Sequence, residues 1–200
     1  NKSYDNHTGR TLKGMYRMPK SKKISMRPVS IIGVGSTPFG KSDSSIIALA
    51  IKSSVEAIDS AHVKYDDIQS IYLGNYVGER LANQGSLAAM LAHRLGISDI
   101  PATKTEGACA SGGIAFRHAF LTIALGLHDF VLATGVEKMT SSSTPDVTAA
   151  LATAGDMEME MYAGLTFPGA FAMIMVSHMK RYGTTRKQIA SVSVKNHHNG

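Results

Sequence analysis

Short apolar runs alternate with longer segments of helical periodicity over the first two thirds of the chain. Four runs have the length and residue types of buried strands: 29–35, 68–74, 100–105 and 130–135. Three segments between or after them have helical spacing: 44–58, 84–95 and 114–125. This alternation predicts an α/β fold with a largely parallel sheet that helices cover on both faces. We expect Asp43 or Ser44 to cap the first helix and Gly96 to close the second.

The chain has one cysteine, and it lies in Glu106-Gly107-Ala108-Cys109-Ala110-Ser111-Gly112-Gly113. The following segment, 114–125, is apolar on nearly every face, which predicts a buried helix. If that helix begins near Cys109, free backbone N–H groups and the positive end of the helix dipole lie close to the sulfur. Such a setting lowers the pKa of a thiol and favours the nucleophilic thiolate. The alternative is a buried structural cysteine.

The net charge of +6 is concentrated at the N-terminus. Residues 1–28 carry +7, and the other 172 residues sum to −1. The part of the chain that is predicted to fold therefore has no basic footprint for nucleic acid. We predict that residues 1–28 form a basic flexible arm, either a remnant of organelle targeting or a solvated tail without a function.

Composition argues against several other classes. No apolar run approaches the roughly 20 residues of a membrane-spanning helix. One cysteine excludes an internal disulfide and fits a reducing compartment. We expect no metal site, because the neighbouring His197 and His198 would point about 100° apart on a helix and no second cysteine is present to help bind zinc.

Residues Gly35–Ser42 match the P-loop pattern G-x-x-x-x-G-K-[ST]. Their predicted place, between a strand and a helix, also fits a P-loop. However, Pro38 lacks one of the backbone N–H groups that hold phosphate, and Phe39 places a large ring where the backbone must approach a ligand. Nucleotide binding through Gly35–Ser42, dependent on Lys41, is kept as an alternative.

From Ser141 onward the character of the sequence changes. Ser141–Pro145 has the composition of a linker, and a methionine-rich stretch follows at positions 157, 159, 161, 173, 175 and 179. Clustered methionines are usually adaptable core residues, so we predict that these are core. The alternative is an apolar face for an acyl chain or a pantetheine arm.

The residues around Cys109 resemble the nucleophile motif of the thiolases, C-x-S-G, at the mouth of a buried helix. The resemblance runs from about Val29 to Gly200. Further segments carry it: Ile32–Phe39, Gln84–Gly85, His93–Ile97, Ile100–Pro101 and Val194–His197. Val131–Met139 is similar to the G-x-E-K-M strand of the sterol-carrier-protein branch, whereas other thiolases usually carry a serine where Lys138 stands. The likeness at Ile32–Phe39 argues against the P-loop interpretation.

This resemblance implies the thiolase fold, which is a five-layered α-β-α-β-α arrangement of two similar halves in the complete protein. A loop domain inserted in the N-terminal half covers the coenzyme A site. Residues 29–140 would then form the N-terminal thiolase core and residues 141–200 the start of the loop domain. On this resemblance, the C-terminal half would be absent from this chain.

The resemblance also implies reversible thiolytic cleavage of a 3-ketoacyl-CoA to an acyl-CoA and acetyl-CoA. Cys109 would be the nucleophile and acyl acceptor, and its backbone N–H would donate to the oxyanion. Coenzyme A is then a substrate, no permanently bound cofactor is expected, and the partners are acyl-CoA, coenzyme A and a second copy in a homodimer. A thiolase-like protein that binds acyl-CoA or lipid without turnover is the alternative.

The family's other catalytic motifs, H-D-C-F, G-H-P and C-x-G, have no functional counterpart in this sequence. We therefore expect this chain to be the N-terminal portion of a longer protein, unable to fold stably or to catalyse by itself. The basic arm favours a mitochondrial location, and the family's lipid chemistry keeps a peroxisome-like organelle as the alternative.

Overall fold

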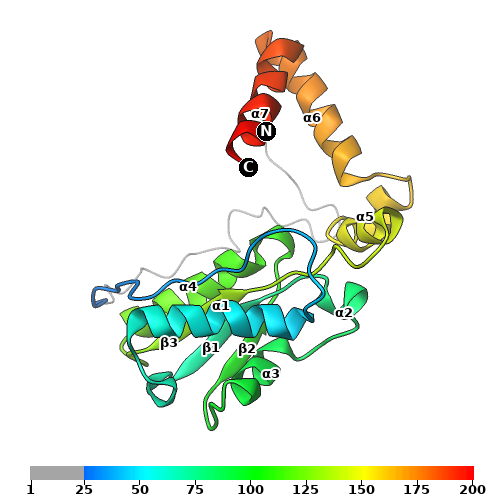
Figure 1. Ribbon diagram of the computed structural model, residues 1–200. Helices are drawn as coiled ribbons and strands as arrows, with labels where there is room; N and C mark the ends of the chain where they lie inside the picture. Colours follow the sequence, from blue (N-terminus) through cyan, green and yellow to red (C-terminus); the bar gives the residue numbers. More distant parts are fainter. Residues whose placement is uncertain (1–24) are drawn as a thin grey trace, which may run out of the picture.

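The computed structural model describes residues 25–200 (Figure 1). Its helices and strands, in chain order, are α1 (Ile46–Ala61), β1 (Ser70–Gly74), α2 (Gly78–Leu81), α3 (Leu87–Arg94), β2 (Ala102–Thr105), α4 (Ser111–Ala124), β3 (Val131–Gly135), α5 (Thr144–Ala152), α6 (Phe167–Tyr182) and α7 (Arg186–Asn199). Short 3₁₀ turns lie at Tyr65–Asp67 and Ala108–Ala110, and a π-helical turn at Met157–Met161. The predicted α/β class is confirmed. The predicted basic arm lies outside the described residues up to position 24.

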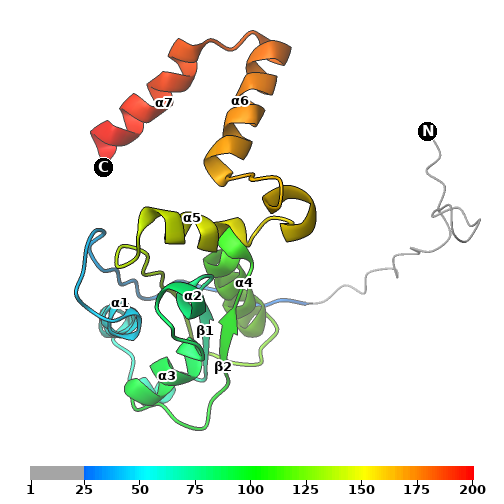
Figure 2. The ribbon, with the colours of Figure 1, turned by 90° about the vertical axis from the view of Figure 1, so that its right-hand side faces the viewer.

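The three strands form one parallel sheet in the order β2-β1-β3. Ile71 of the central strand is opposite Ala102 on one side and Leu132 on the other. Helix α4 packs against all three strands on one face, and α1 and α3 pack on the other (Figures 1 and 2). The prediction of a parallel sheet covered on both faces is therefore confirmed for the residues that the structure describes.

The core lies between the sheet and the layer of α1 and α3. Ile71 and Leu73 of β1 are completely buried, as are Leu87 and Leu91 of α3. Helix α1 buries every fourth residue: Ile46, Ala50, Ser54 and Ile58. Its N-cap is Ser45, whose hydroxyl accepts the Ala48 N–H, so the predicted caps were wrong by one or two positions.

Helix α4 is not buried on nearly every face as the sequence predicted. Small residues, among them Ala115 and Ala119, face the sheet, whereas the exposed fractions of Phe116 and Phe120 are 52% and 40%. The sheet covers only one side of the helix. The small side chains permit a close approach there, and the described residues leave the aromatic side open.

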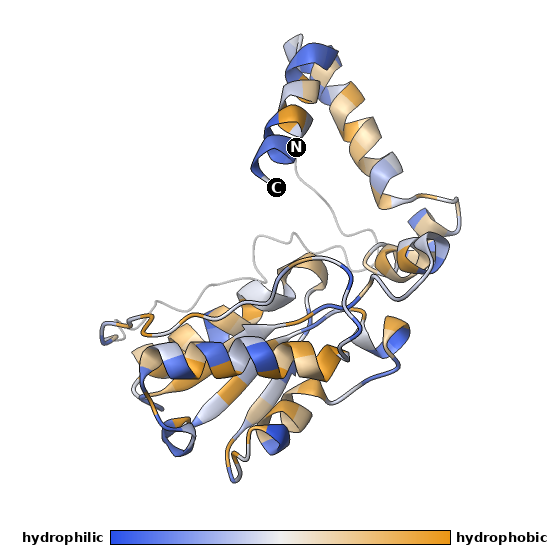
Figure 3. Cartoon of the chain, viewed as in Figure 1, coloured by the Kyte–Doolittle hydropathy of each residue, from blue (hydrophilic) through white to orange (hydrophobic). Residues whose placement is uncertain are grey.

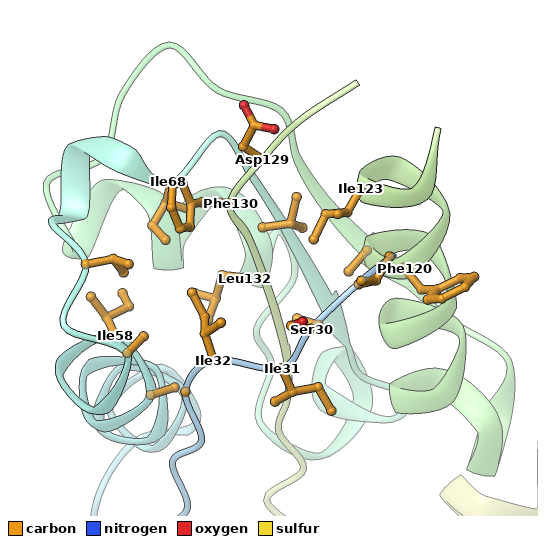
Figure 4. Close-up of a pocket in the computed structure, with 18 of the residues that line it drawn as sticks. Ser30, Ile31, Ile32, Ile58, Ile68, Phe120, Ile123, Asp129, Phe130 and Leu132 are labelled. Carbon is orange, nitrogen blue, oxygen red and sulfur yellow. The ribbon is translucent and has the colours of Figure 1, made fainter. Parts of the chain in front are cut away.

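Residues 29–35, predicted to be the first strand, form no strand. They run close to α1 instead, since a Cβ added to Gly33 or Gly35 would lie 2.1 Å from the carbonyl oxygen of Ala57 or Ser53. An apolar cavity of about 170 Å³ is lined by Val29–Gly33 and by Val131–Ala133 of β3 (Figure 4). The apolar pattern indicated strand propensity correctly, but a strand needs a paired edge, and these residues pair with none.

Beyond β3, helix α5 packs against α2, and α6 and α7 extend away from the sheet (Figures 1 and 2). Helix α6 is largely apolar (Figure 3), and the prediction of a methionine core is wrong. Four of the methionines are exposed: Met157 (56%), Met159 (79%), Met173 (60%) and Met175 (46%). An apolar face for an acyl chain or pantetheine stays a prediction.

Within residues 25–200, no helix combines the length and the apolar character needed to cross a membrane.

Candidate functional site

Cys109 lies at the carboxyl end of the parallel sheet. Strand β2 ends at Thr105, and the chain then enters the 3₁₀ turn that contains Cys109 before α4 begins at Ser111. The cysteine is exposed. The predicted position, just past a strand and at the start of a helix, is confirmed, and the alternative of a buried structural cysteine is wrong. The carboxyl edge is where α/β sheets usually bind ligands.

Hydrogen bonds from Ser111 hold the turn around Cys109. The Ser111 hydroxyl accepts the Gly107 N–H (3.1 Å) and donates to the Ala108 carbonyl (2.7 Å). The Glu106 carboxylate accepts the Ala108 N–H at 2.6 Å, and Ala108 has a left-handed φ of 48°. Among the described residues, the Cys109 N–H has no acceptor. This N–H is therefore available to a ligand, and its oxyanion role stays a prediction.

The turn is also connected to the central strand. The Thr105 hydroxyl donates to the Ser111 carbonyl at 3.0 Å, and the Asn75 N–H donates to the Thr105 carbonyl at 3.2 Å. Asn75 directly follows β1. The position of the cysteine turn thus depends on contacts from a strand that is far away in sequence.

Glu137, just beyond β3, forms hydrogen bonds to the turn after β1. One carboxylate oxygen accepts the Asn75 side-chain N–H at 2.9 Å. The other accepts the backbone N–H groups of Tyr76 (2.9 Å) and Val77 (3.2 Å). Asn75, which is 2% exposed, also donates to the Val136 carbonyl at 2.9 Å. Neither residue was predicted from the sequence as a member of the site; Glu137 was visible only as a letter of the G-x-E-K-M pattern.

The same region fixes the start of the chain beyond the sheet. The Tyr76 hydroxyl is 2.8 Å from the Thr153 hydroxyl and donates to the Leu151 carbonyl at 3.3 Å, which connects the β1 turn to α5. On the other side, the Lys138 ammonium donates to the Ser44 carbonyl at 2.6 Å. These contacts anchor α5 and the end of β3 beside the sheet's carboxyl edge.

One ion pair lies beside edge strand β2. The Lys104 ammonium is 2.7 Å from the Glu79 carboxylate. This hydrogen bond and the Lys104 charge hold the pKa of Glu79 below its ordinary value.

His118 is half-buried in α4, with its ring edge against Tyr72 at 5.5 Å between ring centres.

The loop Gly35–Ser42 lacks the geometry of a phosphate site. The Ser36 N–H donates to the Glu56 carboxylate at 3.0 Å, which puts a negative charge at a backbone donor that a P-loop would offer to phosphate. Phe39 is completely exposed, and among the described residues no strand precedes the loop. Within the described part of the chain, no group of three or more histidine, cysteine, aspartate or glutamate side chains could hold a metal ion.

Residues 29–200 match the family model described as "Thiolase, N-terminal domain". Over 175 residues, the chain is 43% identical to an acetyl-CoA acetyltransferase of Methanothermobacter thermautotrophicus and 39% identical to one of Methanocaldococcus jannaschii. These alignments cover 87% of this chain and 45% and 44% of the two relatives. Sterol carrier protein 2 of Gallus gallus is 28% identical over 185 residues, which cover 87% of this chain and 33% of that protein. The chain thus spans less than half the length of these relatives.

Proposed function

We propose that this chain, which belongs to the thiolase family, carries the nucleophilic cysteine of a 3-ketoacyl-CoA thiolase. The observation that supports this function best is the position of Cys109, exposed on the turn between β2 and α4. The names of the archaeal relatives, both acetyl-CoA acetyltransferases, agree with acyl transfer to or from coenzyme A.

In the proposed reaction, the Cys109 thiolate attacks the C3 carbonyl carbon of a 3-ketoacyl-CoA. The S–C bond forms, the C2–C3 bond breaks, and the acetyl-CoA enolate leaves and takes up a proton. A second coenzyme A then loses its thiol proton and attacks the acyl group on the sulfur. The acyl-CoA leaves, Cys109 returns to its thiolate form, and ping-pong kinetics follow.

The Cys109 N–H, which has no acceptor among residues 25–200, supports one part of this proposal. A backbone donor on a turn before a helix is suited to hold the negative charge that develops on the carbonyl oxygen. The groups that handle the two protons have no counterpart among residues 1–200. We assign them to the C-terminal half of a complete protein, which would have the five-layered thiolase fold.

Several properties of that complete protein belong to the proposal. Strand β2 is at one edge of the described sheet, and its unpaired outer side supports a homodimer formed beside Cys109. Residues 141–200 would begin a loop domain over the coenzyme A site. The basic N-terminal residues support a mitochondrial location, with a peroxisome-like organelle as the alternative.

The test is the intact mass of the complete protein after incubation with acetoacetyl-CoA, beside a Cys109→Ala control. We expect a gain of one acetyl group that is missing in the control and is removed by coenzyme A. If acetoacetyl-CoA binds but no acetyl group reaches the protein, the nucleophile assignment is wrong. The alternative, acyl-CoA binding without turnover, would then replace it.

A further inference from the structure

We propose that Glu137 is a positioning residue that holds the Cys109 turn in place through Asn75. Its consequence for acyl transfer rests on the function proposed above. Among the described residues, the Glu137 carboxylate bonds to Asn75, Tyr76 and Val77 and not to Cys109. It acts through hydrogen bonds that begin at its carboxylate beyond β3, pass through the turn after β1 and end at the turn after β2.

The Glu137 carboxylate forms hydrogen bonds to the turn that follows β1. Both oxygens of Glu137 face N–H donors: one faces the side chain of Asn75, and the other faces the backbone of Tyr76 and Val77. A carboxylate accepts on both oxygens, whereas a glutamine has one acceptor oxygen and one NH₂ group. Glutamine at this position would therefore leave N–H groups facing its own NH₂.

Further hydrogen bonds connect Asn75 to the turn that contains Cys109. Asn75 is 2% exposed and bonded through its side-chain NH₂ group, its side-chain oxygen and its backbone N–H. The Asn75 backbone N–H donates to the Thr105 carbonyl, and the Thr105 hydroxyl donates to the Ser111 carbonyl. Ser111 in turn bonds to Gly107 and Ala108, the two residues before Cys109. A change in the orientation of Asn75 is thus passed on through two hydrogen bonds to Ser111, and through the Ser111 hydroxyl to the cysteine turn.

The position of Glu137 makes such coupling useful. The three parallel strands end at the same edge, and the Glu137 and Asn75 contacts connect all three ends. Without a cross-strand connection, each loop at this edge would move independently. Because an acyl transfer requires a nucleophile placed to within a fraction of an ångström, a loosened turn slows the reaction more than it weakens substrate binding.

The test compares Glu137→Gln with Glu56→Gln in the complete protein. Glu56 is a matched control, because its carboxylate also accepts a loop N–H, that of Ser36, but has no bond to the Cys109 network. The first readout is backbone hydrogen exchange at Gly107, Ala108 and Ala110, whose N–H groups are hydrogen-bonded in the turn. We expect exchange about fivefold faster or more in Glu137→Gln, with α1 and α3 unchanged, and no effect in Glu56→Gln.

The second readout is the single-turnover acylation of Cys109 by acetoacetyl-CoA. We expect the acylation rate to fall about tenfold or more in Glu137→Gln. The acetoacetyl-CoA concentration that gives half of the maximal rate should change by less than about twofold. Unchanged exchange at Gly107, Ala108 and Ala110, or faster exchange with unchanged acylation, would overturn the proposal. So would a variant that fails to fold, since Glu137 would then be required for folding rather than for positioning.

The two proposals fail in distinguishable ways. If the unmodified protein is never acylated, the thiolase function is wrong, and the hydrogen-exchange comparison still decides whether Glu137 positions the Cys109 turn. If the unmodified protein is acylated and Glu137→Gln behaves like Glu56→Gln, only the role of Glu137 is wrong.

Discussion

Gly74 and Gly112 lie in direct contact where the central strand meets the first turn of α4. A Cβ added to Gly74 would be 2.5 Å from the Gly112 nitrogen and 2.6 Å from its Cα. No side chain fits between the end of β1 and the start of the helix. Because Cys109 comes just before α4, this contact sets how close the cysteine turn lies to the carboxyl edge of the sheet.

Gly74→Ala is therefore expected to displace the start of α4. We predict a loss of about 1–3 kcal/mol in the free energy of unfolding, the usual effect of overpacking, and slower acylation of Cys109. Gly113→Ala is the matched control, because a Cβ there meets nothing within 4 Å among the described residues. Urea denaturation and the acylation assay measure both effects. Equal stability of the two variants would show that the Gly74–Gly112 contact does not exclude a side chain at position 74.

Ser111→Ala removes the hydroxyl that closes the cysteine turn. The Gly107 N–H and the Ala108 carbonyl both lose their partner at a residue that is 5% exposed. We predict a loss of about 1 kcal/mol in stability, because the half-buried Gly107 N–H and Ala108 carbonyl lose their hydrogen-bond partner, together with slower acylation. Ser191→Ala removes a similar hydroxyl from exposed helix α7, where it donates to the Gln188 carbonyl, and should cost less than about 0.5 kcal/mol. Thermal unfolding curves of the two variants test this difference.

Arg27 caps the C-terminal end of α4. Its backbone N–H donates to the Ala124 carbonyl (3.0 Å), and its guanidinium donates to the carbonyls of Ile123 (2.6 Å) and His128 and pairs with Asp129 (2.7 Å). We predict that Arg27→Ala lowers the free energy of unfolding by about 1 kcal/mol, because the helix end loses a cation and carbonyl partners.

Asp129→Asn is the comparison for Arg27→Ala. It removes only the exposed ion pair and should cost no more than about 0.5 kcal/mol. Denaturation in urea distinguishes the two variants. A larger loss in Asp129→Asn than in Arg27→Ala would contradict the assignment of Arg27 as a helix cap.

The Glu79–Lys104 pair predicts a pH dependence. The pKa of Glu79 in the folded protein lies below the ordinary value of 4.5, because Lys104 donates a hydrogen bond to its carboxylate and adds a positive charge. The pair's contribution to stability is therefore present above that ordinary value and is lost as the pH falls through the lowered pKa. Lys104→Met should raise the pKa of Glu79 toward its ordinary value, as measured by NMR titration of the carboxyl carbon. An unchanged titration midpoint would contradict the assigned cause.

The sequence predicted the parts of this fold that depend on local patterns. Strands β1, β2 and β3 and helices α1, α3 and α4 all lie within or beside the ranges expected from apolar periodicity. The position of Cys109 followed from the same patterns, since a short strand, a glycine-rich turn and a helical segment come in that order. These features depend on neighbours in the chain, so a single sequence carries them.

Three predictions were wrong because the outcome depends on contacts between segments far apart in the chain. Residues 29–35 have strand propensity but no paired edge, and Phe116 and Phe120 lie on the uncovered side of α4. Met173 and Met175 of α6 are exposed. The Glu137–Asn75 connection joins residues 62 positions apart, and the Gly74–Gly112 contact depends on how a helix crosses a strand. The sequence by itself therefore determined the order of elements and the nucleophile candidate. Only the tertiary structure decided which surfaces are covered and what holds the cysteine turn, because both depend on contacts between segments far apart in the chain.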